Sequence, residues 1–315
     1  MTEPSRTAVI AVGGNALSPP GEHSTIADQF RHTRESLGPI VDFALEGWRV
    51  VVVHGNGPQV GDELVRNEKA RSEVAPLPLG VLVAGTAGWI GYMLQQSLEN
   101  ALRKAGNARD VVTILTQVEV AADDPALQDP TKFIGHGISI ARARELRVQG
   151  HPVKKDAKGR FRRVVGSPKP LAIHELATIR SLVERDTVVI ACGGGGIPVY
   201  RDPLLGLEGV DAVVDKDLAA AVLARELGAE LFLILTDVDA VYTGWGTEEK
   251  RAIRSMTVSE ADRFASEGAF GEGSMAPKVA AAADYVRRTQ GRAIITELSK
   301  GRAAVQGVGG TEILP

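Results

Sequence analysis

The sequence predicts an α/β fold, a three-layer αβα sandwich in which helices cover both faces of a parallel sheet. Two observations lead to this prediction. Short strand-like runs of apolar residues alternate with longer helical segments along the 315 residues, and three of these runs end in glycines. Alternation of this kind is typical of βαβ units, which build parallel sheets with helices packed on them.

The predicted strands are short runs rich in valine, isoleucine and leucine, a composition typical of strands buried on both faces. They cover residues 9–12, 50–53, 111–118, 187–191, 231–235 and 293–296. The predicted helices are longer segments in which apolar residues recur among polar ones. After a first such stretch at about 25–47, they cover residues 59–71, 84–105, 171–184, 217–227, 258–266 and 276–288.

Glycines follow three of the predicted strands, in the segments Gly13-Gly14-Asn15, His54-Gly55-Asn56-Gly57 and Gly193 to Gly196. Glycine lets the backbone approach a ligand closely, and the start of a helix offers unpaired N–H groups to negative charge. A buried strand that leads through glycines into a helix is therefore suited to hold an anion. We expect a phosphate-containing substrate at these turns.

Composition and charge exclude several other classes of protein. Lysine plus arginine (36) against aspartate plus glutamate (39) gives a net charge of −3, which argues against a protein that coats nucleic acid. The single cysteine, Cys192, excludes an internal disulfide and fits a reducing compartment, so we expect a cytoplasmic protein. The polar start at residues 1–7, followed by an apolar run only one strand long, predicts neither a signal peptide nor a membrane span.

The segment 129–169 interrupts the alternation of strands and helices. It holds eleven lysines or arginines against three acidic residues, and residues 153–161 are typical of a β-hairpin with its turn near Gly159. On charge alone, a solvated hairpin and a functional lid are equally good interpretations. The position of the segment beside Lys132 favours an inserted lid.

Two lysines stand at predicted helix starts, Lys216 after Asp215 and Lys278 after Pro277. A cation there opposes the helix dipole by roughly 0.3–1 kcal/mol, so two such placements beside three glycine turns indicate a bound anion. Either lysine alone would be interpreted as a surface residue. Asp217 either caps a helix or orients the two lysines, and Asp215, open to the same two interpretations, is the weaker candidate. Phosphoryl transfer needs such a set of lysines and backbone amides, together with Mg²⁺.

Thr236 and Asp237 follow the most apolar strand, at the carboxyl edge where open α/β sheets bind ligands. A nucleotide-binding loop and a turn stabilised by its own side chains are equally good interpretations of this pair.

No P-loop motif is present, and the glycines after His54 have the wrong spacing for a dinucleotide-binding fingerprint. We interpret His54 and Cys192 as structural residues and assign no residue as a metal ligand.

Together these motifs resemble those of the carbamate kinases, within the amino acid kinase superfamily, over nearly the whole chain. The superfamily shares some of them, whereas the His54 run, the lid motif Thr131-Lys132 and the four-glycine run are together far more specific. The matching segments are Gly13–Leu17, His54–Gly61, Asp129–Lys132, Ser167–Pro170, Gly193–Val199, Asp215–Ala219, Leu235–Asp239 and Ser274–Lys278.

The resemblance implies one domain over residues 1–315, with a mostly parallel sheet of about eight strands, and usually a homodimer. An amino-terminal lobe at about 1–205 would bind carbamate or carbamoyl phosphate and carry a lid insertion at about 122–170. A carboxyl-terminal lobe at about 206–315 would bind ATP or ADP with Mg²⁺. The implied reaction is reversible phosphoryl transfer between ATP and carbamate, which typically runs toward ATP in arginine and carbamoyl phosphate catabolism.

The resemblance also assigns roles to residues of this chain. Lys216 and Lys278 would flank the transferred phosphoryl group, and Asp217 would orient them. Lys132 would close from the lid onto carbamoyl phosphate. The substrate- and phosphate-binding residues would be Gly13, Gly14, Asn15, Gly55, Asn56, Gly57, Gly194 and Gly195. The nucleotide-binding residues would be Thr236, Asp237, Tyr242, Ser274 and Met275.

Several positions depart from the family pattern. Phe133 and His136 stand where proline is usual, Trp89 stands where glutamine is usual, and Ala240 replaces a common glycine. These differences bear on the acceptor, so one alternative is a kinase of another small acid, such as an acetylated amino acid, or of a nucleoside monophosphate. A second alternative is a non-catalytic nucleotide or metabolite sensor. The lid motif favours carbamate.

Overall fold

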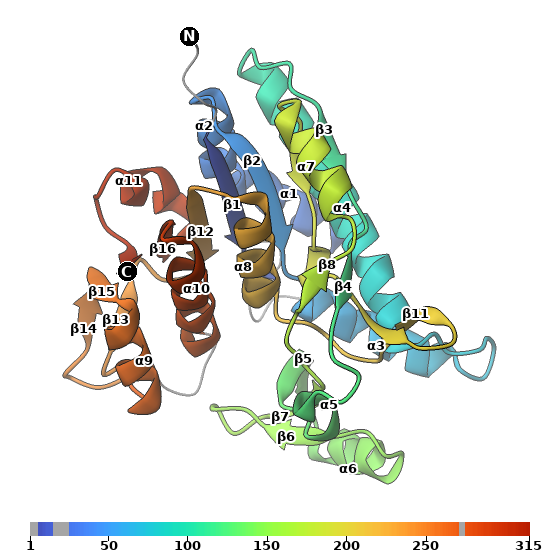
Figure 1. Cartoon of the computed structure of the whole chain (residues 1–315). Helices are drawn as coiled ribbons and strands as arrows, with labels where there is room; N and C mark the ends of the chain where they lie inside the picture. Colours follow the sequence, from blue (N-terminus) through green and yellow to red (C-terminus); the bar gives the residue numbers. More distant parts are fainter. Residues whose placement is uncertain (1–5, 15–24, 271–274) are drawn as a thin grey trace.

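The computed structural model describes residues 6–14, 25–270 and 275–315, and it has the α/β architecture that the sequence predicts (Figure 1). Within these residues, eight strands form the main sheet in the order β15-β17-β16-β12-β1-β2-β9-β3. All neighbouring pairs are parallel except β16 and β17. The strands are β1 (Thr7–Val12), β2 (Arg49–His54), β3 (Val111–Thr113), β9 (Val188–Ile190), β12 (Leu231–Thr236), β15 (Ser255–Thr257), β16 (Arg292–Glu297) and β17 (Thr311–Leu314).

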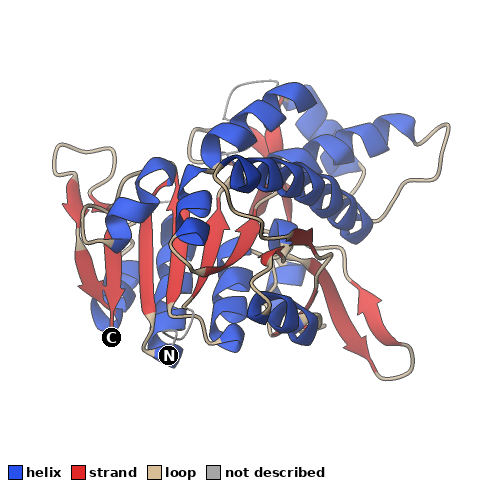
Figure 2. Cartoon of the chain, turned by 90° about the horizontal axis from the view of Figure 1, so that it is seen from above, coloured by secondary structure: helices blue, strands red, loops and turns tan. Residues whose placement is uncertain are grey.

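Helices cover both faces of this sheet, as Figure 2 shows. Because side chains alternate along a strand, β1 packs Ala8, Ile10 and Val12 into one half of the core and Val9 and Ala11 into the other. The predicted three-layer sandwich is therefore confirmed. The first half of the core is completed by α2 (Gly38–Leu45), α4 (Leu79–Lys104) and α11 (Gly301–Val305), and the second by α7 (Leu176–Glu184), α8 (Lys216–Leu227), α9 (Val258–Ser266) and α10 (Met275–Thr289).

Most predicted elements occur within a few residues of their expected bounds, with three differences. The stretch 25–47 contains two helices, α1 (Ile26–Ser36) and α2, because Pro39 is tolerated in a first turn but not in a helix interior. The run 111–118 is divided between β3 and β4 (Gln117–Glu119), which belong to different sheets. Residues 171–184 begin with the short strand β8 (Ala172–Ile173) before α7 starts.

Smaller sheets lie beside the main one. The sequence did not predict most of their strands, which are short and lack a continuous apolar run. A four-stranded sheet has the order β11-β10-β4-β8, and a hairpin pairs β13 with β14. Outside the main sheet lie the predicted helix α3 (Gly57–Ala70) and the elements α5 (Pro125–Gln128), β10 (Ile197–Asp202), β11 (Gly206–Gly209), β13 (Val241–Thr243) and β14 (Arg251–Ile253).

The segment expected to form a lid has its own sheet, in the order β5-β7-β6, with one helix packed on it. The predicted hairpin is confirmed: β6 and β7 pair antiparallel, and Gly159 at the turn has φ +73°. In Figure 1 these elements project from the main body below α3. They are β5 (Lys132–Ile138), α6 (Ile140–Val148), β6 (Val153–Lys155) and β7 (Phe161–Val165).

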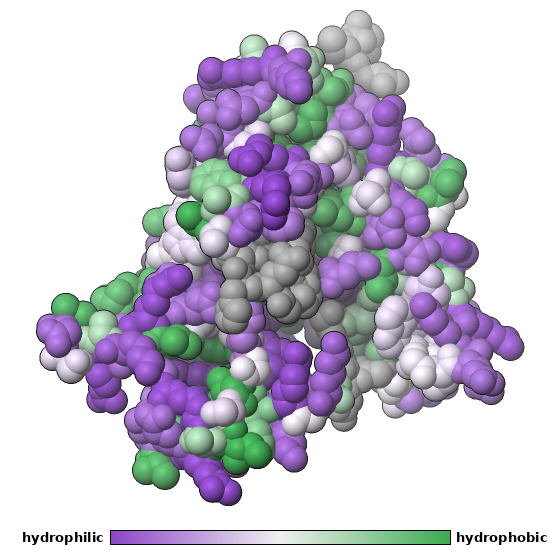
Figure 3. Space-filling model, turned by 180° about the vertical axis from the view of Figure 1, so that it is seen from behind, coloured by the Kyte–Doolittle hydropathy of each residue, from purple (hydrophilic) through white to green (hydrophobic). Residues whose placement is uncertain are grey.

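The parallel strands place their carboxyl ends along one edge of the main sheet, the edge at which such sheets bind ligands. Gly13 follows β1, Gly55 follows β2, and Asp237 follows β12, so segments far apart in sequence meet there. The face seen in Figure 3 is mainly hydrophilic, with apolar residues in small separate patches. Among the described helices, none combines the length and apolar character needed to cross a membrane.

Candidate active site

The carboxylate of Asp217 lies between the two lysines that the sequence singled out. Lys216 Nζ is 2.5 Å from Asp217 Oδ1, and Lys278 Nζ is 3.2 Å from Asp217 Oδ2. The three side chains are nearly buried, with 11%, 8% and 3% of Lys216, Lys278 and Asp217 exposed. Three predicted residues thus form one compact group, the lysine cluster, in which two ammonium groups contact a single carboxylate.

Local sequence explains why the two lysines meet. Asp215 is the N-cap of α8, and its Oδ1 accepts the N–H of Asp217 at 2.9 Å, so α8 begins at Lys216. Met275 begins α10, and Lys278 lies in its first turn. Because α8 and α10 pack against each other, these first turns come together.

Positive charge is costly at this position. Burial lowers the pKa of Lys216, and the charge of Lys278 acts in the same direction, while Asp217 opposes the shift. The N-termini of two helices add partial positive charge to the same place. A bound anion would lower the electrostatic free energy of the lysine cluster, which makes the cluster a suitable site for a phosphoryl group.

Lys132 reaches the same place from the lid. Its Nζ lies 2.8 Å from Asp215 Oδ2, and 24% of the lysine side chain and 20% of the aspartate side chain are exposed. Burial alone would raise the pKa of Asp215, but the charges of Lys132, Lys216 and Lys278 outweigh it and hold the pKa well below its usual value. Asp215 therefore stays ionised and joins the lid to the start of α8.

Two glycine turns lie directly against the lysine cluster. A Cβ on Gly55 would lie 3.1 Å from the backbone N of Gly14 and 3.3 Å from Lys216 Cδ, so glycine permits an approach that a side chain would crowd. The N–H groups of Gly13 and Gly55 are both donated, at 3.2 Å, to carbonyls at the ends of β12 and β1. These two glycines bring the chain close to the cluster, while their own N–H groups are already used.

The four-glycine turn differs from expectation, because the chain continues from it into β10 and not into a helix. Its glycines are buried. A Cβ on Gly194 would collide with the carboxamide of Asn56, and one on Gly195 with the carbonyl of Val214. Glycine is needed here for close packing behind Asn56, which follows β2 and is the N-cap residue of α3.

The geometry supports the structural interpretation of His54 and Cys192. His54 is fully buried, and burial lowers its pKa to about 4, so the ring is neutral near pH 7. Its Nδ1 lies 3.0 Å from the carbonyl oxygen of Gly55 and donates its proton there. Burial raises the pKa of the Cys192 thiol, which is the opposite of what a thiolate nucleophile requires.

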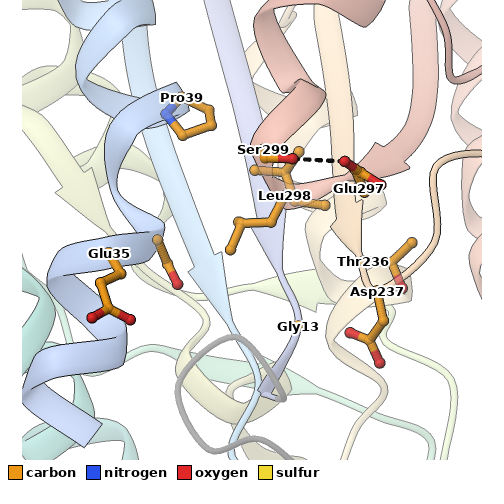
Figure 4. Close-up of a pocket in the computed structure, with 10 residues that line it drawn as sticks. Gly13, Glu35, Pro39, Thr236, Asp237, Glu297, Leu298 and Ser299 are labelled. Atoms are coloured by element: carbon orange, nitrogen blue, oxygen red, sulfur yellow. Dashed lines mark hydrogen bonds between the residues drawn. The ribbon is translucent and has the colours of Figure 1, made fainter.

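A cavity of about 310 Å³ opens at the carboxyl ends of β1, β12 and β16 (Figure 4). Two predicted nucleotide-binding residues, Thr236 and Asp237, line it together with Gly13. The charged residues in its described lining are Asp237, Glu35 and Glu297, all of them acidic. The phosphates of a nucleotide therefore fit the lysine cluster better than this cavity.

Two other predicted nucleotide-binding residues, Tyr242 and Met275, are not part of the described lining of that cavity. The Tyr242 hydroxyl donates to Asp239 at 2.6 Å, which raises the pKa of the tyrosine, and its ring packs edge-on against Trp245. Lys250 Nζ lies 4.2 Å from the centre of each of these two rings. Met275 packs partly buried against the core. Two further predicted residues, Asn15 and Ser274, lie outside the described part of the chain.

Asp215 has a larger role in the structure than its sequence pattern indicates. This residue was the weaker candidate of the Asp-Lys-Asp triplet, yet it is both the cap of α8 and the acceptor for Lys132. Asp215 stands directly before the first residue of a predicted helix, and an aspartate at this position indicates an N-cap. Its second partner lies 83 residues away in sequence, and no spacing rule connects the two.

Comparisons with known proteins agree with this geometry. The model of the amino acid kinase family matches residues 6–297. A carbamate kinase of Pyrococcus furiosus is 42% identical over 313 residues, which cover 98% of this chain and 99% of the relative. The carbamate kinase-like protein YqeA of Escherichia coli is 43% identical over 313 residues, with the same coverage of 98% and 99%.

A solved structure agrees as well. Carbamate kinase from Giardia lamblia bound to AMP-PNP has a TM-score of 0.90 and 35% identity, with 98% of each chain covered. The match extends over the main sheet, the lid and the carboxyl-terminal elements, because it spans nearly the whole chain. The chain therefore belongs to the amino acid kinase family and, within it, to the carbamate kinases.

Proposed function

We propose that this chain is an ATP-dependent phosphotransferase that catalyses reversible phosphoryl transfer between ATP and carbamate. The observation that carries the proposal is the contact of Asp217 with both Lys216 and Lys278, beside two glycine turns. This arrangement concentrates positive charge in a nearly buried place without supplying a general base. Carbamate and the terminal oxygen of ADP are already anions, so their reaction needs charge and positioning only.

In the direction of ATP formation, a terminal β-phosphate oxygen of ADP forms a bond to the phosphorus of carbamoyl phosphate. The bond from phosphorus to the carbamate oxygen breaks, and carbamate leaves with the electron pair. Lys216 and Lys278 would neutralise the oxygens of the phosphoryl group in flight. Asp217 would hold both lysines in place, and Lys132 would balance charge on carbamoyl phosphate and the departing carbamate.

Glycine turns and the backbone beside the lysine cluster complete the proposed substrate site. Gly14 and Gly55 would let the substrate phosphate approach the chain closely, next to Lys216. Gly57 begins α3, so its N–H is one of the donors that a helix start offers to an anion. Gly194 and Gly195 would act by shaping the turn behind Asn56.

Thr236, Asp237, Tyr242 and Met275 are the proposed nucleotide side of the site. Mg²⁺ would enter with the nucleotide, since this ion usually binds through phosphate oxygens, water and one or two carboxylates. Asp237, whose carboxylate lines the cavity at the end of β12, fits as such a ligand. When bound, the ion neutralises charge on the nucleotide phosphates.

We extend the proposal to a homodimer formed through α4. Val81 and Tyr92 are 49% and 57% exposed and lie on one face of this helix. Leu115, 51% exposed, lies beside that face, because a Cβ on Gly88 would meet it at 3.8 Å. A Tyr92→Arg variant should then elute as a monomer where the parent elutes as a dimer.

We also propose, on the basis of the family resemblance, that the chain has two lobes that meet near residue 205. On the same basis we propose that the protein acts in the cytoplasm, in arginine and carbamoyl phosphate catabolism.

A coupled assay tests the central proposal. Carbamoyl phosphate and MgADP should yield ATP, detected through hexokinase and glucose-6-phosphate dehydrogenase. Chelation of Mg²⁺ should stop ATP formation when the ATP is measured directly by chromatography. The absence of ATP formation by folded protein would contradict the proposal.

The alternative acceptor is supported by the departures Phe133, His136 and Trp89 and by the similarity to a protein named only carbamate kinase-like. A panel of small acids and nucleoside monophosphates, each supplied with MgATP, separates this alternative from carbamate. Nucleotide binding without transfer to any acceptor would instead establish a sensor.

A further inference from the structure

One carboxylate connects the lid to the start of α8. Asp215 Oδ2 contacts Lys132 Nζ at 2.8 Å, while Oδ1 of the same side chain accepts the N–H of Asp217 at 2.9 Å. The two carboxylate oxygens of Asp215 therefore bind different partners. One caps the helix that presents Lys216 and Asp217, and the other holds a lysine from the first strand of the lid.

The balance of charge shows why this second contact matters. Lys132, Lys216 and Lys278 bring three positive charges to the site, and Asp215 and Asp217 bring two negative ones. Without the charge of Asp215, three ammonium groups would share one carboxylate. Lys132 is the most exposed of the three lysines, so repulsion would move it toward solvent first.

Among the described residues, the lid also makes ionic contacts with α3, one of them between His136 of β5 and Asp62, 3.4 Å apart. Glu68 on α3 contacts Arg142 of α6 and Arg163 of β7. These contacts hold the body of the lid, whereas Lys132 stands at the first position of β5. The side chain of Lys132 is held by Asp215 and not by the Glu68 group.

We propose that Asp215 is a positioning residue that holds Lys132 beside the start of α8 before substrate arrives. Carbamoyl phosphate then meets a lysine that is already ordered, and less conformational entropy is lost on binding. The kinetic consequence rests on the proposed function. The contact between the lid and α8 does not, and it can be measured in ligand-free protein.

The test uses Asp215→Asn, because asparagine caps a helix about as well as aspartate but carries no charge. We expect the KM for carbamoyl phosphate to rise about tenfold, equivalent to about 1.4 kcal/mol, with kcat and the KM for ADP changed less than about threefold. Asp211→Asn is the matched control. Asp211 lies in the same loop and accepts the N–H of Gly80 at 3.2 Å, so this variant removes a nearby charge that is not paired with Lys132.

A double-mutant cycle identifies the partner. Lys132→Met alone should weaken binding of carbamoyl phosphate, and adding Asp215→Asn should cost no more than about twofold further, because the partner is already gone. Additive losses would overturn the proposal. So would an Asp215→Asn variant that behaves like Asp211→Asn.

Amide hydrogen exchange of ligand-free protein gives a readout that does not depend on activity. Residues 131–135 should exchange about tenfold faster in Asp215→Asn than in the parent, beyond any change seen at α10. Unchanged exchange at 131–135 would overturn the proposal even if the enzyme is active. Faster exchange in a protein without kinase activity would support the contact and contradict only the proposed function.

Discussion

Replacing Asp217 by asparagine tests the lysine cluster most directly. The side chain is 3% exposed and contacts two ammonium groups, at 2.5 Å and 3.2 Å. Asparagine has nearly the same shape, so the change removes one negative charge and little volume. Lys216 and Lys278 are then left facing each other in a nearly buried place.

The expected loss of stability follows from this geometry. Removing one partner of a buried ion pair typically costs about 3–5 kcal/mol. Repulsion between the two ammonium groups acts in the same direction. For 315 residues the entropy of unfolding is about 0.66 kcal/mol/K, so about 3 kcal/mol corresponds to a fall in melting temperature of about 4–5 °C.

The loss should depend on pH with a definite sign. Burial lowers the pKa of Lys216 in the folded protein below its usual 10.5. At any pH below this lowered pKa, the charge on Lys216 makes the folded protein less stable. Asp217 opposes that shift, so its removal lowers the pKa further and increases the cost at pH 7. The deficit of the variant should therefore shrink as the pH rises from 7 toward 10, because folded Lys216 loses its proton at a lower pH in the variant than in the parent.

Thermal unfolding followed by circular dichroism between pH 7 and 10 measures both effects. Asp284→Asn on α10 is the matched control, because Asp284 pairs with Arg288 at the surface, with 35% of the aspartate side chain exposed. Its melting temperature should stay within about 2 °C of the parent. Equal melting temperatures for Asp217→Asn and Asp284→Asn, or a deficit that grows with pH, would refute the reasoning.

Three further predictions follow from other contacts. Lys278→Ala should lower kcat by about 10²-fold or more in the coupled assay, as for a single electrostatic stabiliser, and a kcat near that of the parent would count against its role. Gly194→Ala should lose about 2–4 kcal/mol in urea unfolding, because the residue has φ +70° and its Cβ would collide with Asn56. Gly106→Ala, at φ +77° with open space around it, should lose only about 1–2 kcal/mol, and equal losses would exclude the collision. Glu68→Gln should speed amide exchange of the lid by about tenfold or more, since Arg163 loses its carboxylate and Arg142 keeps only Glu145, and unchanged exchange would contradict this.

The sequence by itself determined the fold class and the identity of most candidate residues. Alternation of apolar runs with helical segments is a local property, and it predicted the three-layer sandwich that the cores on both sides of β1 confirm. Parallel strands end at one edge, so the glycines after β1 and β2 and the pair Thr236-Asp237 had to share that edge. Lys216 and Lys278 were recognisable because each stands where a helix begins.

Only the tertiary structure decided which side chains contact each other. The packing of α8 against α10 placed two lysines on one carboxylate, and the fold of the lid brought Lys132 to Asp215 across 83 residues of sequence. It also gave the four glycines after β9 packing roles, Gly194 against Asn56 among them, and divided one apolar run between two sheets. The physical reason is that helix and strand signals act between near neighbours in the chain, whereas ion pairs, collisions and sheet membership depend on distances that exist only after the layers have packed.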